Sequence, residues 1–111
     1  MPISKYYLFD QNTVYLAQLL KAMSCPTRLF ILDFMHTHGT VTNKQLVEAI
    51  GELSQSTISG HLKHLKEANL ITATQRETSM IYSLNEPLWS LMRQVAGRFA
   101  EVGLGERRDD I

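Results

Sequence analysis

The stretch that decides the fold runs from Ser54 to Leu70 and reads SQSTISGHLKHLKEANL. At helical spacing it places Ile58, Leu62 and Leu65 on one narrow apolar stripe. The opposite face carries small or hydrogen-bonding side chains and then cations: Gln55, Ser56, Ser59, Gly60, Lys63 and Lys66. Short side chains let a helix approach base edges in the DNA major groove, and lysine meets phosphate. The pattern favours a recognition helix; an ordinary amphipathic helix with a solvated polar face is the alternative.

The segments on both sides of this helix complete a recognisable unit. Before it, Thr42 and Gln45 have the spacing of a capping box, and Gly51 ends the short helix that they open. Two short helices joined by about three or four residues, with glycine at the junction, are typical of a helix-turn-helix. After it, the runs ITATQ and SMIYSL bracket residues 76–78 and predict a β-hairpin, which would be a wing.

Three further helices are expected around this unit. The first begins near Thr13, with Leu16, Leu19, Leu20 and Met23 on one apolar face. The second opens at Pro26, is capped by Ser24 or Cys25, ends near Thr37 before Gly39, and has a core face of Leu29, Ile31, Leu32 and Met35. Thr40 and Val41 form a short extended piece. The last helix follows Asn85 and Pro87 and is apolar on more than one side, more than a monomer core needs.

Length and composition are those of one soluble domain covering residues 1–111, with residues 1–12 as an arm or helix start and 104–111 as a frayed polar tail. The formal net charge is zero, but residues 54–76 hold Lys63, Lys66 and Arg76 against one acidic residue. This local excess fits a few phosphate contacts and argues against tight non-specific binding. A single cysteine, no long apolar run and no signal-peptide pattern predict a cytoplasmic protein without membrane association.

At this point the residues resemble a known family, the ArsR-type winged-helix regulators. Residues 24–32 (SCPTRLFIL) resemble the second-helix motif of that family, residues 53–68 resemble its recognition helix, and residues 81–85 (IYSLN) resemble the exit of its wing. The match covers roughly residues 13–100 with order and spacing intact. It implies a mostly α-helical winged helix-turn-helix with a small β wing, in the order α-α-(β)-α-α-β-β-α.

The resemblance further implies a homodimeric transcription factor, usually a repressor, that binds a palindromic operator on double-stranded DNA. The expected DNA-binding residues are Gln55, Ser56, Thr57, Ser59, His61, Lys63 and Arg76. His61 has a second interpretation, because it lies beside Leu62 and Leu65 and could simply pack. The dimer would form through the first and last helices, with Leu16, Leu19, Trp89, Met92, Ala96 and Phe99 at the interface.

Departures from the family concern the signal that is sensed. The thiolate motif of the arsenic and cadmium sensors would lie near residues 41–45, which hold no cysteine, and the last helix holds no histidine for the zinc and nickel motif. We therefore expect no metal and no cofactor at these positions. A non-standard metal site drawn from Cys25, Asp33, His36 and His38 is an alternative, as is a redox switch at Cys25. The effector, whether a small molecule or an oxidant, is left open.

Two phenylalanines stand out on the second helix. Phe30 occupies a position where the family commonly has a polar residue, and Phe34 lies one turn along the same face. We expect both rings to be covered by Tyr6, Tyr7 and Leu8 or by the partner subunit, or else to line an effector pocket.

Two other classes of function compete with a DNA-binding regulator. The near-zero net charge leaves open a winged-helix module that binds protein rather than DNA. An enzyme is not expected, because no catalytic spacing of nucleophile, base or paired carboxylates is found.

Overall fold

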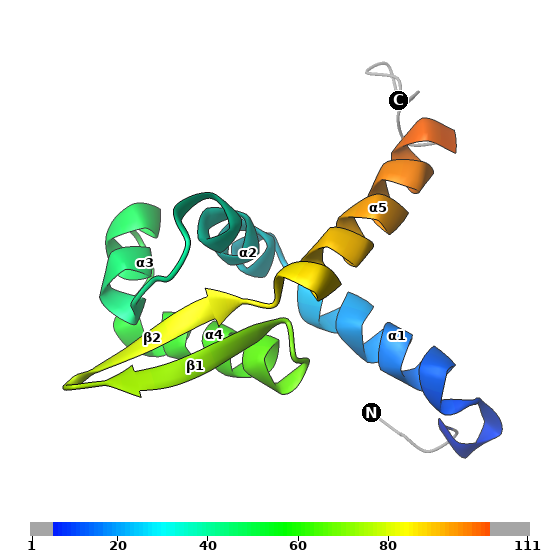
Figure 1. Cartoon of the computed structure of the whole chain (residues 1–111), viewed down its shortest axis with the longest axis horizontal. Helices are drawn as coiled ribbons and strands as arrows, with labels where there is room; N and C mark the ends of the chain where they lie inside the picture. The colour runs from blue at the N-terminus through cyan, green and yellow to red at the C-terminus, as the bar shows by residue number, and fades with distance from the viewer. Residues whose placement is uncertain (1–5, 103–111) are drawn as a thin grey trace.

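The computed structural model describes residues 6–102, with side chains described for residues 7–97. Five α-helices and one hairpin follow in the predicted order. Their bounds are η1 (a 3₁₀ turn, Tyr6–Leu8), α1 (Gln11–Met23), α2 (Pro26–His38), α3 (Asn43–Ile50), α4 (Gln55–Glu67), β1 (Ile71–Arg76), β2 (Ser79–Leu84) and α5 (Glu86–Val102). The short extended piece is present too: Val41 forms a single antiparallel β-bridge with Tyr82 of β2. The winged helix-turn-helix is confirmed (Figure 1).

Local capping chemistry sets where the helices begin and end. The Thr42 hydroxyl accepts from the Gln45 backbone N–H at 3.2 Å, and the Gln45 side chain accepts from the Thr42 N–H at 2.8 Å, so the capping box is complete. Ser54 caps α4 by accepting from the Thr57 N–H at 3.1 Å. Cys25 occupies the N-cap of α2 without a side-chain cap bond. The helix α1 begins two residues earlier than predicted, because Asp10 accepts from the Thr13 N–H.

The core lies where α1, α2, α3 and α4 meet the hairpin and the start of α5. Ile58, Leu62 and Leu65 are at most 1 % exposed, which confirms the apolar stripe of α4. Fully buried partners come from the neighbouring elements: Ile31, Leu32, Met35, Val41, Leu46, Leu70 and Ile71. At about 25 cal/mol per Å² of apolar surface, burial of these side chains is the main force that holds α4 in place.

Leu29, which the sequence predicted for the core, lies outside it, and so do two leucines of the apolar face of α1. Leu16, Leu20 and Leu29 are 46 %, 49 % and 43 % exposed. On α1 the buried positions are Leu19 and Ala22, so a narrower face of that helix packs against the core than the spacing of its leucines suggests. Leu29 lies about 200° around α2 from Ile31, because two residues span more than half a turn. Apolar spacing alone does not say which side of a wide apolar face is covered.

The hairpin turns without glycine. β1 and β2 are antiparallel, with Ile71 opposite Leu84 and Arg76 opposite Ser79, so Glu77 and Thr78 form the turn. Glu77 has φ of 53°, a left-handed conformation that costs a residue with a Cβ atom about 1 kcal/mol. Before the hairpin, Asn69 adopts φ of 63° just after α4, a position where asparagine is tolerated.

The molecule has two ends with different surfaces. Figure 1 shows the hairpin reaching out on one side, with α1 and α5 extending away from the body on the other. The radius of gyration is 16.0 Å, against about 13 Å for a compact chain of this length. The extended side carries apolar residues in water: Leu16 and Leu20 on α1, and Leu91, 54 % exposed, on α5.

Candidate nucleic-acid interface

The polar face of α4 is open to solvent. Gln55, Ser56, Thr57, Ser59 and Lys63 are all exposed, while the apolar stripe of the same helix is buried. The first turn is ordered by a hydroxyl cluster: Ser54 donates to the Thr57 hydroxyl at 3.0 Å and lies 3.3 Å from the Ser56 hydroxyl. The structure thus places short polar side chains together at the N-terminal end of an outward-facing helix.

Asn43, the first residue of α3, is part of this surface and was not among the residues expected from the sequence. Its Nδ2 donates to the Ser59 hydroxyl at 2.8 Å and to the Gln55 carbonyl at 3.3 Å. Its Oδ1 is buried without a partner. Because this contact spans 16 residues and depends on the angle between two helices, only the capping box at Thr42 hinted that α3 begins here.

A groove separates α4 from the wing. Its volume is about 370 Å³, and its walls come from the start of α3, the first turns of α4 and the hairpin: Thr42, Asn43, Lys44, Gln55, Ser59, Thr78, Ser79, Met80 and Tyr82. The start of α3, the first turns of α4 and the wing therefore border one groove, whose walls are polar except for Met80 and the ring of Tyr82. Arg76 is exposed at the end of β1, next to the turn of the hairpin.

The cations of this region are available to a ligand. Lys63, Lys66 and Arg76 are exposed. Across residues 7–97, whose side chains are described, none of the three lies within ion-pair distance of an acidic side chain; the single contact of that kind found there joins His36 to Glu86. Unpaired surface lysine and arginine can contact phosphate without first breaking an internal ion pair.

His61 faces inward rather than along the polar face. It is partly buried, and its Nδ1 accepts from Nε of Arg28 on α2 at 3.1 Å. Burial, helped by the nearby positive charge of Arg28 and by His64, lowers the pKa of His61 below its ordinary value. Arg28 also donates to the Ala22 carbonyl at the end of α1, so the pair links α4 to α2 and α1. This geometry favours the packing interpretation of His61 over a DNA contact.

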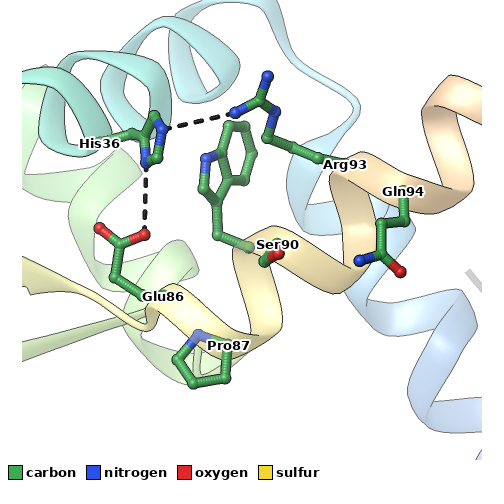
Figure 2. A pocket seen from close by; sticks show the side chains of 7 residues that line it. His36, Glu86, Pro87, Ser90, Arg93 and Gln94 are labelled. Atoms are coloured by element: carbon green, nitrogen blue, oxygen red, sulfur yellow. Dashed lines mark hydrogen bonds and ion pairs between the residues drawn. The ribbon is translucent and has the colours of Figure 1, made fainter.

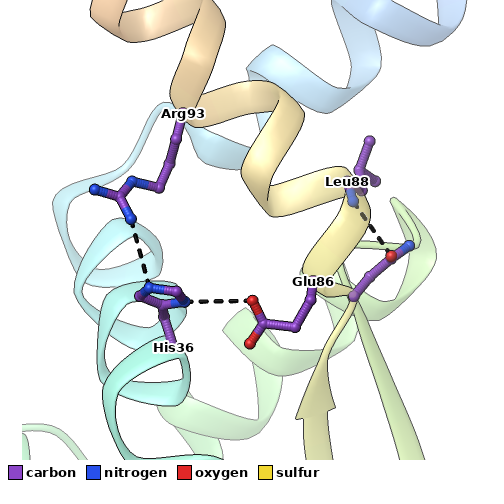
Figure 3. Close-up of polar contacts among 5 residues, drawn as sticks. His36, Glu86, Leu88 and Arg93 are labelled. Atoms are coloured by element: carbon purple, nitrogen blue, oxygen red, sulfur yellow. Dashed lines mark hydrogen bonds and ion pairs between the residues drawn. The ribbon is translucent and has the colours of Figure 1, made fainter.

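A second polar cluster lies between α2 and α5. His36 Nδ1 is 3.3 Å from a carboxylate oxygen of Glu86, and Nη1 of Arg93 is 3.4 Å from His36 Nε2 (Figures 2 and 3). Guanidinium cannot accept a hydrogen bond, so Nε2 accepts and Nδ1 carries the proton that is donated to Glu86. The three residues border an open hollow of about 590 Å³ at the start of α5.

One histidine of the candidate metal set, His36, is part of this cluster and forms hydrogen bonds there instead of a metal site. His36 bonds to α5 rather than sharing a site with Asp33, and His38 bonds to the Phe34 carbonyl of its own helix at 3.0 Å. Within the described part of the chain, no three His, Cys, Asp or Glu residues are grouped so that they could hold a metal ion. Cys25 is half-buried at the start of α2, and its redox role stays a prediction.

The phenylalanine pair is not covered by the N-terminal residues that the structure describes. Phe30 is 43 % exposed and stacks on Phe34, whose ring stacks in turn on His38 with centroids 4.0 Å apart. Tyr7 and Leu8 are themselves 79 % and 62 % exposed, so the expected cover by the arm is wrong for these two residues. The side chain of Tyr6 lies outside the described residues. Cover by a partner subunit stays a prediction.

The expected interface residues separate into two groups. Leu19, Trp89 and Met92 are 4 %, 7 % and 4 % exposed within a single chain, so they pack in its own core and have little surface left for a partner. Leu16 and Ala96 are exposed. The side chain of Phe99 lies outside the described residues.

Comparison with known proteins agrees with this architecture. The family described as "Bacterial regulatory protein, arsR family" matches residues 25–73. The chain is 31 % identical over 71 residues to the transcriptional repressor PagR of Bacillus anthracis, covering 64 % of this chain and 70 % of PagR. It is 33 % identical over 79 residues to an arsenical resistance operon repressor of Staphylococcus xylosus, covering 71 % and 74 % respectively.

A solved structure gives the same fold at lower identity. The homodimeric winged helix-turn-helix DNA-binding domain from Mycobacterium bovis superposes with a TM-score of 0.74 at 23 % identity, over 97 % of each chain. None of the helices in the described range has the length and apolar character needed to cross a membrane. Fold, motif and relatives agree: this chain belongs to the ArsR family of bacterial regulatory proteins. Members of this family are DNA-binding winged-helix transcriptional regulators rather than enzymes.

Proposed function

We propose that residues 1–111 act as one winged-helix domain that pairs into a homodimer and represses transcription from a palindromic operator, in the cytoplasm. The observation that carries the proposal is the exposed polar face of α4, continuous with the groove beside the wing. The named relatives are repressors, which supports this direction of regulation.

Dimerisation is supported by the surface on α1 and α5. Leu16 and Leu20 are one helical turn apart and about half exposed, and Leu91 adds a third apolar side chain. The solved Mycobacterium bovis protein of this fold is homodimeric. A two-fold dimer would present two copies of α4 about one DNA turn, roughly 34 Å, apart, which requires a palindromic site.

Within this proposal the residues of the interface have different roles. Gln55, Ser56 and Ser59 face base edges, while Lys63 and Arg76 contact phosphates at α4 and at the wing. Thr57 orders the first turn through its two hydrogen bonds with Ser54 and lies exposed beside the residues that face DNA. His61 acts indirectly: its bond with Arg28 holds α4 against α2.

Selection of bound duplexes from a random pool tests the proposal. We expect a palindrome whose half-site centres are about 10 base pairs apart, and affinity that falls steeply as salt rises. A module that binds protein through an apolar surface is the second candidate, favoured by the zero net charge. Such a module would enrich no sequence and would show little salt dependence.

The signal that releases the repressor has three separate candidates. They are a small-molecule effector at the hollow beside His36, a small-molecule effector at Phe30, and oxidation of Cys25. Each predicts that the effector lowers operator affinity of the wild-type protein but not of a variant at its own residue.

A further inference from the structure

The polarity of the Asn43–Ser59 contact bears on which bases the helix can read. The Asn43 amide cannot be turned around, because the Gln55 carbonyl that it contacts at 3.3 Å can only accept a hydrogen bond. The NH₂ group therefore faces both Gln55 and Ser59. It follows that the Ser59 oxygen is the acceptor in the 2.8 Å bond.

A serine in a helix commonly donates its hydroxyl to the carbonyl one turn earlier, which for Ser59 is that of Gln55. Here no such bond forms, and Asn43 occupies that carbonyl instead. With its oxygen accepting from Asn43, the Ser59 hydroxyl keeps its proton for an outside partner. Ser59 is exposed and lines the groove between α4 and the wing, so this partner would come from the DNA side.

We propose that Asn43 is a positioning residue that occupies one of the two lone pairs of the Ser59 oxygen and turns the Ser59 O–H toward a base edge, and that Ser59 thereby favours an acceptor in the major groove. The acceptors there are guanine O6 and N7, adenine N7 and thymine O4. The amino groups of cytosine and adenine are donors, and only one lone pair of Ser59 is left to accept from them. This inference rests on the proposed function, because it assigns the specificity of the same surface.

The experiment compares Ser59→Ala, Asn43→Ala and the double variant with the wild type. The measured quantity is the ratio of affinity for the selected operator to affinity for an unrelated duplex at fixed salt. We expect each single change to lower this ratio about tenfold, the usual effect of removing one hydrogen bond to a base, and the double change to lower it no further. Lys44→Ala is the matched control on the same turn of α3, and it should weaken binding to both duplexes equally.

A second measurement identifies the acceptor directly. Each purine of the selected operator is replaced by its 7-deaza analogue, each guanine also by 2-aminopurine, which lacks O6, and each thymine by a base without O4 at that position. One replacement per half-site should weaken wild-type binding about tenfold and leave the Ser59→Ala variant unaffected.

Several outcomes would overturn the inference. They are an unchanged affinity ratio for Asn43→Ala, effects that multiply in the double variant, and a uniform weakening on both duplexes, which would mean that Ser59 contacts phosphate. If the wild type itself prefers no sequence, the proposed function fails, and that result is distinct because it appears before any substitution is made. Circular dichroism of each variant verifies that α3 and α4 are folded.

Discussion

Replacing two leucines on the exposed face of α1 should separate the subunits without unfolding them. Leu16 and Leu20 are 46 % and 49 % exposed in the single chain. Complete burial of a leucine side chain contributes roughly 2 kcal/mol, so about half of that, about 1 kcal/mol, is still available at each position for a partner. Two positions in each of two chains give about 4 kcal/mol. Truncation of both to alanine should therefore raise the dimer dissociation constant about a thousandfold.

Sedimentation equilibrium over a wide range of protein concentration measures this change, and operator affinity of the same samples should fall with it. Met80→Ala is the control for the dissociation constant only, because Met80 is 38 % exposed and lies on the wing, away from α1 and α5, but it also lines the groove proposed to face DNA. Circular dichroism should show full helix content in both proteins. A dissociation constant within a few-fold of the wild type for the double leucine variant would refute the placement of the interface on α1.

Other parts of the molecule lead to further predictions. Lys63→Ala and Arg76→Ala should each weaken binding to specific and non-specific duplexes alike, and each should reduce the salt slope of log affinity by about 1 for the phosphate that it no longer neutralises, measured by fluorescence anisotropy. Thr42→Ala removes half of the capping box of α3 and should lower the free energy of unfolding, measured by urea titration, by about 1 kcal/mol. An unchanged free energy of unfolding would contradict a role of this cap in stability. The pKa of His61 is lowered in the folded protein, so the unfolded chain takes up the proton first, and the free energy of unfolding should decline as the pH falls below about 6.5, the ordinary value for histidine. The denaturant midpoint of the wild type should therefore fall more steeply with decreasing pH than that of His61→Gln. Parallel pH profiles for the two proteins would contradict the burial of His61 as the cause of the acid destabilisation. Glu77→Gly should raise the midpoint of denaturant unfolding slightly, because glycine adopts the positive φ of the turn without strain.

The His36–Glu86–Arg93 cluster shows how a polar contact can join two parts of the fold with different roles. It connects α2, which belongs to the DNA-binding unit, to α5, which extends toward the proposed partner (Figure 3). Its residues are 57 positions apart at most, and no local pattern relates them. A metal ion was one interpretation of His36 from sequence, but the structure supplies it with a carboxylate and a guanidinium instead.

The sequence by itself determined the elements and their order. The period of the Ser54–Leu70 stretch, the capping residues Thr42 and Ser54, and the β-branched runs of the hairpin act over a few residues, so their outcome depends little on the rest of the chain. The polar face of α4 could be predicted for the same reason, because burying one stripe of a helix leaves the opposite stripe in water.

Only the tertiary structure decided how these elements use their side chains. The angle between α3 and α4 brings Asn43 to Ser59, the packing of α2 on α4 turns His61 toward Arg28, and the seating of α5 buries Trp89 in the chain's own core while Leu16 stays exposed. Each contact joins residues that are distant in sequence. Spacing along one helix says which residues share a face, and only the neighbouring elements determine what that face meets.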